Sequence, residues 1–166
     1  MQSVILQSDR SGTPVRMEYV RGRFKVEASP ASRHQKASKR IEGAIRPSPA
    51  ADTGCGCYSL ADVLIRFHGP DEALKRPDIA VFCVEPPDSD EALDMLPAAV
   101  IEILSLGYEE KDLGQDGAAF YRSCGVADVI VFDPRTGVVR HYHAADVEVL
   151  QSPTTIELAC GCRATV

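Results

Sequence analysis

The segments Arg76-Pro-Asp-Ile-Ala-Val-Phe-Cys83 and Ala98-Ala-Val-Ile-Glu-Ile-Leu-Ser105 decide how this chain folds. Short runs rich in Val and Ile are typical of buried strands, and we expect strands at Ile79–Val84 and Ala98–Leu104. Asp78 precedes the first run and Glu102 lies inside the second. A carboxylate in such a place must be paired, protonated or bound to metal, unless its strand is an edge and the acid faces water. If the two strands are neighbours, the two acids and a backbone carbonyl would form an oxygen-rich site suited to Mg²⁺ or Mn²⁺.

The patterns around these runs predict a mixed sheet with few helices. A helix is expected from Ser29-Pro30 to Pro47, because a capping serine precedes a proline at the first helical position, and a second is expected at Asp112–Ser123. Further strands are expected at Val15–Tyr19, Phe24–Glu27, Ser59–Phe67, Val129–Phe132, Val138–His143 and Ile156–Cys162. With 166 residues, the chain is predicted to be a single α/β domain, a central mixed sheet flanked by helices.

The formal net charge of −6 argues against nucleic-acid binding, but this value is an average over the whole chain and hides a local basic segment. Residues 33–46 hold five basic residues and one acid, so this helix is basic within an acidic chain. Arg33, Lys36 and Arg40 are spaced to form one stripe. That stripe is either a solvated helix surface or a ridge that contacts phosphates, which supply most non-specific affinity for DNA. No apolar run is long enough to span a bilayer and no export signal is visible, so we expect a cytoplasmic protein without a membrane partner.

Six cysteines include two Cys-Gly-Cys tripeptides, Cys55–Cys57 and Cys160–Cys162. Without a sign of export, reduced thiols are expected. Four thiolates could hold Zn²⁺ if the tripeptides met in space, although structural zinc usually takes ligands spaced two to four residues apart. The alternative is two strand ends with small, half-buried side chains. Cys83 and Cys124 are interpreted as core residues.

His141 and His143 are expected on one face of a strand, a geometry that can bind zinc or copper. Because no acid or thiol is reliably placed beside them, we interpret this segment as an exposed strand of the last hairpin.

Pro77-Asp78 followed by Glu102 resembles the PD-(D/E)XK nuclease pattern, and the chain is similar to the Uma-type family of putative restriction endonucleases. The resemblance rests on the following residues in order: Met17-Glu18-Tyr19, Gly22, Ser29-Pro30, His34, Arg76-Pro77-Asp78, Glu102–Ser105, Lys111-Asp112-Leu113, Tyr121, Gly125-Val126 and Val131–Pro134.

This resemblance implies a restriction-endonuclease-like core and Mg²⁺- or Mn²⁺-dependent hydrolysis of DNA. Asp78 and Glu102 would be metal ligands, with the Ile103 carbonyl as a candidate third. His34 and Glu18 become further candidates for the site, Glu18 as an additional acid. The basic stripe would follow the DNA backbone, and a homodimer would supply two sites for the two strands.

The chain departs from the family pattern at the catalytic lysine. The superfamily places a lysine two residues after the glutamate, where this chain has Leu104. Lys111 is the nearby substitute, unless Gln115 or a basic residue of the first helix serves; it would stabilise charge at phosphorus or position water. Two alternatives stay open: a catalytically impaired nuclease fold that binds nucleic acid or protein, and a zinc-stabilised protein built on the Cys-Gly-Cys pairs.

Overall fold

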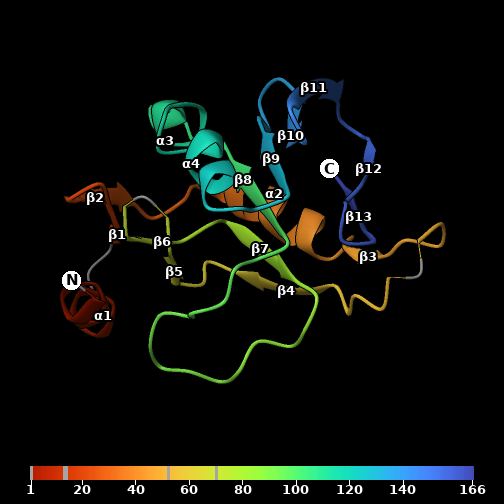
Figure 1. The fold of residues 1–166 in the computed structure, drawn as a ribbon. Helices are drawn as coiled ribbons and strands as arrows, with labels where there is room; N and C mark the ends of the chain where they lie inside the picture. Colours follow the sequence, from red (N-terminus) through yellow and green to blue (C-terminus); the bar gives the residue numbers. More distant parts are fainter. Residues whose placement is uncertain (1, 13–14, 52, 70) are drawn as a thin grey trace.

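A six-stranded mixed sheet forms the centre of the computed structural model, which describes residues 2–12, 15–51, 53–69 and 71–166 (Figure 1). Its strands, in spatial order, are β11 (Asp146–Gln151), β10 (Val138–His143), β9 (Asp128–Phe132), β8 (Ala99–Ile103), β7 (Ile79–Phe82) and β4 (Tyr58–Ala61). Strands β8 and β9 run parallel and the other neighbours run antiparallel. The two apolar runs are buried strands, as predicted, and the structure shows that they are neighbours in the sheet.

Two smaller sheets and four helices pack around this centre. One sheet has the order β2 (Arg23–Ala28), β1 (Val15–Val20), β6 (Ala73–Lys75), β5 (Ile65–Phe67); the other has the order β12 (Thr155–Glu157), β13 (Cys162–Thr165), β3 (Arg46–Pro47). The helices are α1 (Gln2–Arg10), α2 (Ser32–Glu42), α3 (Glu109–Leu113) and α4 (Ala118–Ser123).

Side chains alternate between the two faces of β7 and β8, so the central sheet carries a core on each face. On one face, Ala80 and Val100 pack with α4 and with the β2-β1-β6-β5 sheet, which includes Phe67. On the other face, Ile79 and Ile101 pack with α2 and the C-terminal strands β12 and β13. Both faces are covered, which explains why the two strands are apolar throughout apart from their acids.

Three expected elements are divided in the structure. The segment Ser59–Phe67 is two strands, because the chain turns at Asp62, where φ is +56°. The expected helix at Asp112–Ser123 is two short helices, with Gly114–Gly117 between them. The segment Ile156–Cys162 is not one strand but a hairpin that turns at Gly161, where φ is +87°. A glycine is favoured there because other residues adopt this conformation at a cost.

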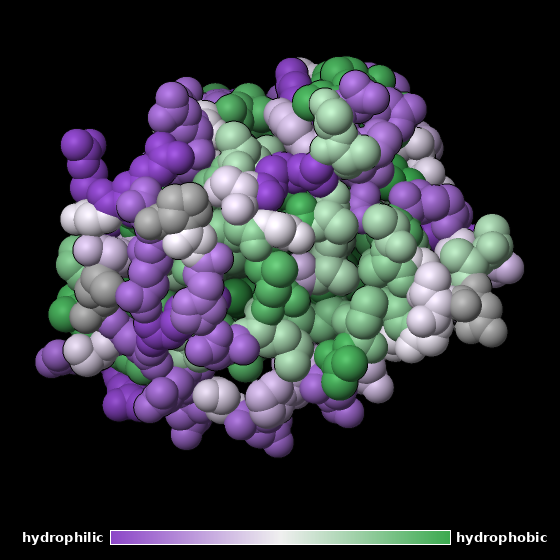
Figure 2. All heavy atoms as spheres, in the orientation of Figure 1, coloured by the Kyte–Doolittle hydropathy of each residue, from purple (hydrophilic) through white to green (hydrophobic). Residues whose placement is uncertain are grey.

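The surface in this orientation is uneven (Figure 2). Hydrophilic side chains dominate over β1 and β2, and apolar side chains gather in the middle, around β7. Within the described ranges, the helices are all too short to cross a bilayer.

Candidate active site

Strands β7 and β8 bring Asp78 and Glu102 together. Ile79 pairs with Ile101, and continuing this antiparallel register by one residue sets Asp78 opposite Glu102. The Asp78 N–H donates to Glu102 Oε2 at 3.1 Å, and the Ile103 N–H donates to Asp78 Oδ2 at 2.8 Å. Each carboxylate is thus held by the backbone of the other strand, so the pair is fixed by the sheet itself.

Asp78 lies at a cavity of about 190 Å³ whose wall also includes His34, Ile103, Lys111 and Asp112. His34, which α2 presents to the cavity, donates from Nε2 to Asp78 Oδ2 at 2.9 Å. Burial opposes ionisation of Asp78, but the bond and charge of His34, the charge of Lys111 and the Ile103 N–H together lower its pKa. Asp78 is therefore a carboxylate anion facing a cavity, as a metal ligand must be.

Glu102, which bonds the Asp78 backbone, is fully buried and does not line this cavity. The Tyr121 hydroxyl donates to its Oε1 at 2.5 Å. Burial, together with the nearby negative charge of Asp78, raises the pKa of Glu102 to about 7, although Lys111 and Lys75 act in the opposite direction. Near neutral pH this carboxyl is divided between its acid and anion forms, so a cation placed near it would favour the anion.

Lys111 reaches the acids from α3. Its Nζ lies 3.1 Å from Glu27 Oε2, 3.8 Å from Glu18 Oε1 and 3.9 Å from Asp112 Oδ1. Burial would lower the pKa of Lys111, but the surrounding carboxylates, Glu18 first, raise it well above its usual value. The lysine predicted to replace the family's catalytic lysine is thus a charged group at the cavity wall.

Glu18 and Asp112 add two buried acids to the cluster. Glu18 accepts the Arg76 N–H at 2.8 Å through Oε1, while Glu18 Oε2 and Asp112 Oδ1 are buried without a hydrogen-bond partner. The pKa of Glu18 is lowered despite its burial, chiefly by Lys111 and Lys75, whereas burial and the charge of Glu102 raise the pKa of Asp112 well above its usual value. Glu18 therefore joins the acid cluster in space, and Asp112 is a member that the sequence argument did not single out.

These donors fit a hard divalent cation. Asp78, Asp112 and Ile103 line one cavity, and two buried carboxylate oxygens accept no hydrogen bond. The pKa values of Glu102 and Asp112 are raised by burial first and by neighbouring carboxylates second. Oxygen ligands of this kind suit Mg²⁺ or Mn²⁺. Glu102 accepts one hydrogen bond at each oxygen, from the Asp78 N–H and the Tyr121 hydroxyl, and each oxygen keeps a lone pair that a cation could use.

A second lysine, Lys75 of β6, was missed in the sequence. It is fully buried, donates from Nζ to the Asp116 carbonyl at 2.6 Å, and lies 4.3 Å from the centre of the Tyr121 ring. The sequence does single out Lys75 as unusual, because a lysine directly after Ala73-Leu74 and before Arg76-Pro77 is rare in a buried strand, but it does not show which groups lie beside it. Gln115, by contrast, is exposed and bonds Arg21, so it is not part of the acid cluster.

The basic stripe of α2 is exposed. Arg33, Lys36 and Arg40 face solvent, whereas His34, Ala37 and Ile41 are buried. The Arg40 guanidinium lies 5.5 Å from the centre of the Phe132 ring. The stripe and His34, which bonds Asp78, thus lie on the same helix, and none of the three stripe residues lines the cavity at Asp78.

The structure corrects the interpretation of His141 and His143. His141 is buried, its Nε2 donates to Asp128 Oδ1 at 2.8 Å, and the two rings stack with their centres 4.4 Å apart. Glu148 of β11 also approaches, and the three side chains offer ligand atoms within 4.8 Å of one another. Acids do lie beside these histidines, because β9 and β11 flank β10.

The cysteines also differ from expectation. Reduced thiols were expected, but Cys55 is bonded to Cys83 and Cys57 to Cys162, so Cys83 is not simply a core residue. Cys124 is a free, half-buried thiol packed against the core, as predicted. The two Cys-Gly-Cys tripeptides do meet in space, because the β12–β13 turn lies against the loop before β4.

Comparisons with known proteins agree with this fold. A family model described as "Putative restriction endonuclease" (Uma2) matches residues 4–161. Among solved structures, one similar chain is a putative nuclease belonging to DUF820 from Anabaena variabilis, with a TM-score of 0.64 and 16% identity over 88% of this chain and 83% of that one. A comparison with curated protein sequences gave no match. Since the family model spans nearly the whole chain, this protein belongs to the Uma2 family of putative restriction endonucleases.

Proposed function

We propose that this chain is a divalent-metal-dependent endonuclease that hydrolyses phosphodiester bonds of DNA. Membership of the Uma2 family supports the nuclease assignment. The observation that carries the metal dependence is the group of buried carboxylates at and beside one cavity, in which one oxygen of Asp112, at the cavity, and one of Glu18, beside it, accept no hydrogen bond. A cluster of this kind would be costly without a cation, because desolvated like charges repel.

In this proposal Asp78, the Ile103 carbonyl and Glu102 hold Mg²⁺ or Mn²⁺, with Asp112 facing the same cavity. Such an ion, when bound, lowers the pKa of water and offsets charge on the scissile phosphate. His34 and the Ile103 N–H fix the Asp78 carboxylate in one orientation. The Lys111 ammonium would stabilise negative charge on the phosphate, with Glu27 and Glu18 holding it at the cavity wall.

The test is plasmid cleavage by the purified chain with Mg²⁺ or Mn²⁺, compared with EDTA. We expect cleavage by the wild type and by Asp88→Asn, an exposed acid between β7 and β8, and loss of at least about 100-fold in Asp78→Asn. Equal cleavage by Asp78→Asn, or cleavage in EDTA, would contradict the proposal.

Calorimetric titration with Mn²⁺ separates metal binding from catalysis. One Mn²⁺ per chain should bind the wild type and Asp88→Asn, and binding should be lost in Asp78→Asn. If Mn²⁺ and DNA bind but the plasmid remains intact, the alternative of a catalytically impaired nuclease fold replaces the endonuclease; its specific feature is the buried Leu104 at the usual lysine position.

A further inference from the structure

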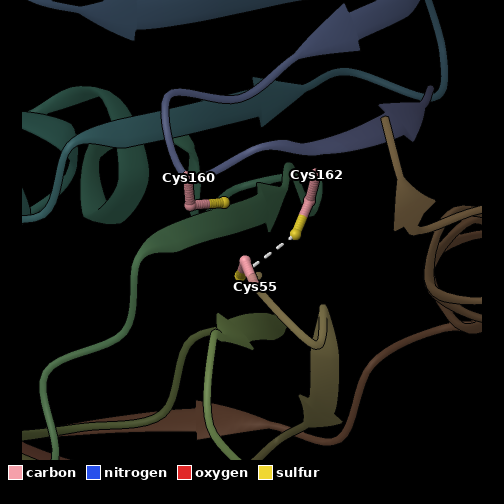
Figure 3. A group of neighbouring side chains, drawn as sticks. All are labelled: Cys55, Cys160 and Cys162. Atoms are coloured by element: carbon pink, nitrogen blue, oxygen red, sulfur yellow. Dashed lines mark hydrogen bonds between the residues drawn. The ribbon is translucent and has the colours of Figure 1, made fainter. Parts of the chain in front are cut away.

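Five of the six cysteines converge from three parts of the chain. Cys55 and Cys57 lie in the loop before β4, and Cys83 follows β7. Cys160 lies in the turn between β12 and β13, and Cys162 is the first residue of β13. Figure 3 shows Cys55, Cys160 and Cys162 directed toward a common point between the hairpin and the loop. This group is remote in sequence from the acids of the candidate active site, and it shares no residue with their cavity.

The sulfur positions match what one tetrahedral metal ion requires. Cys55 Sγ and Cys162 Sγ are 3.4 Å apart, and the Sγ atoms of Cys55, Cys160 and Cys162 all lie within 4.8 Å of one another. Zinc–sulfur bonds of about 2.3 Å in a tetrahedron separate the sulfurs by roughly 3.8 Å. A shift of a few tenths of an ångström to about 1 Å therefore brings three sulfurs to ligand distance.

The backbone holds these sulfurs together independently of any sulfur–sulfur bond. The Thr53 hydroxyl donates to the Cys160 carbonyl at 2.5 Å, and the Gly56 N–H donates to the Cys83 carbonyl at 2.8 Å. Cys162 pairs with Pro47 of β3, and Gly161 makes the turn between the two cysteines of its tripeptide. The same hydrogen bonds would hold the thiols in place after reduction.

Four of the five cysteines share one packing environment. This shared environment identifies Cys57, rather than Cys83, as the fourth ligand beside Cys55, Cys160 and Cys162. Cys55, Cys57, Cys160 and Cys162 all belong to or pack against the core beneath α2 and β13, whereas Cys83 does not. Cys57 is bonded to Cys162 in the structure, so its sulfur is already beside the group. Cys83 is bonded to Cys55 but approaches from the end of β7, where it lines an open groove together with Cys160.

We propose that the reduced protein binds one Zn²⁺ through the thiolates of Cys55, Cys57, Cys160 and Cys162, as a structural site with no open position. Each disulfide takes two electrons and two protons and becomes two thiols. A dithiol supplies both and becomes a disulfide; a phosphine supplies the electrons and becomes a phosphine oxide, while water supplies the two protons and the oxygen. Zinc binding then releases four protons from the four thiols. The disulfide state of the structure and the zinc state are two redox forms of one cluster.

The first test is zinc content. The full chain, reduced with a phosphine under anaerobic conditions, is incubated with Zn²⁺, desalted and analysed for metal. We expect about one zinc per chain, little zinc in chain kept oxidised, and cobalt(II) substitution giving the absorption bands of tetrahedral thiolate coordination. Stoichiometric zinc in the oxidised chain, or no zinc in the reduced chain, would overturn the proposal.

Variants at single cysteines identify the ligands; Cys160→Ser and Cys124→Ser leave both native disulfides intact, and Cys83→Ser removes the Cys55–Cys83 disulfide. Cys160 is a free thiol, so Cys160→Ser leaves both disulfides intact in the oxidised form and should fold, yet it should lose zinc after desalting. Cys124→Ser and Cys83→Ser should retain one zinc. Full zinc content in Cys160→Ser, or loss in Cys83→Ser, would refute the assignment.

A final control concerns the other group that could bind a transition metal, at His141, His143 and Glu148. His143→Ala should retain one zinc per chain and the cobalt thiolate bands. Loss of metal in that variant would move the site to the histidines. None of these measurements depends on nuclease activity, so the zinc site and the proposed function stand or fall separately.

Discussion

Single buried groups set the electrostatics of the candidate active site. Glu102 has an ordinary pKa of 4.5, and its environment raises that pKa to about 7. In the unfolded chain it ionises near its ordinary pKa, while in the folded chain it keeps its proton over a further range of pH. The stability that the proton provides is present below about pH 4.5 and is lost as the pH rises toward 7.

Glu102→Gln removes this dependence, because the amide is neutral at every pH. In metal-free buffer, we expect the variant to gain stability relative to the wild type as the pH rises from about 4.5 to 7, by at most roughly 3 kcal/mol. Urea unfolding across this pH range measures the difference. Glu91→Gln, on an exposed loop, is the control; parallel curves for Glu102→Gln and wild type would show that the pKa is not raised.

Lys111 offers the opposite case, a cation enclosed by acids. Lys111→Met leaves Glu18, Glu27 and Asp112 without this positive charge. Breaking buried pairs in this way costs about 3–5 kcal/mol, and we expect that loss of unfolding free energy at pH 8 and a smaller loss at pH 5, where protonation of the acids relieves repulsion. Lys39→Met, on the exposed side of α2, should change stability by less than about 0.5 kcal/mol. An equal cost at both pH values would argue against the acid cluster as its cause.

At the scale of elements, the break between α3 and α4 shapes the site. A Cβ added at Gly117 would lie 2.0 Å from the Asp112 carbonyl oxygen, so any larger residue at this position must move the backbone of that acid. Gly117→Ala should cost about 1–3 kcal/mol and reduce Mn²⁺ binding and cleavage together. Gly22→Ala, where φ is +78° but the space is open, should cost about 1 kcal/mol and leave Mn²⁺ binding unchanged. Unchanged binding in Gly117→Ala would separate the break from the site.

The basic stripe of α2 is an element whose role remains a prediction. If Arg33, Lys36 and Arg40 contact phosphates, each replacement by Ala should weaken DNA binding and reduce the slope of log K against log salt by about 0.9. Binding is measured by anisotropy in EDTA, where cleavage cannot occur. Arg23→Ala, an exposed base on β2, is the control. A slope that is the same in all variants would favour the alternative of a solvated helix surface.

Most elements could be predicted because their signals are local. Neighbouring residues alone indicate the alternation of burial along β10 and the apolar runs of β7 and β8. Once β7 and β8 are assumed to be adjacent, the sequence also brings Asp78 and Glu102 together. Lys75 and Asp112 could not be recognised as members of the cluster, because their places depend on β6 and α3 packing beside residues far away in sequence. The breaks at Asp62 and Gly117 do not change the hydrophobic period, so the sequence did not reveal them. The first depends on the positive φ of Asp62, and the second lies where the backbone of Gly117 closely approaches that of Asp112.

At the scale of the whole molecule, the chain supplies one acid cluster for a duplex with two strands. A homodimer related by a two-fold axis would present two such clusters, and we expect sedimentation to give a dimer at micromolar concentration and the plasmid to become linear. A monomer that produces only nicked circles would contradict the dimer and leave the endonuclease proposal intact.

The C-terminal hairpin also has a consequence for the order in which the molecule can form. Ala37 and Ile41 of α2, made early in synthesis, are covered in part by Cys162, Ala164 and Val166, made more than a hundred residues later. During translation, that apolar face stays uncovered until the hairpin leaves the ribosome, at an elongation rate of about 5–20 residues per second. For several seconds the nascent chain therefore exposes the apolar surface of α2 that the hairpin later covers, and chaperone binding to nascent chains stalled before residue 155 would reveal it.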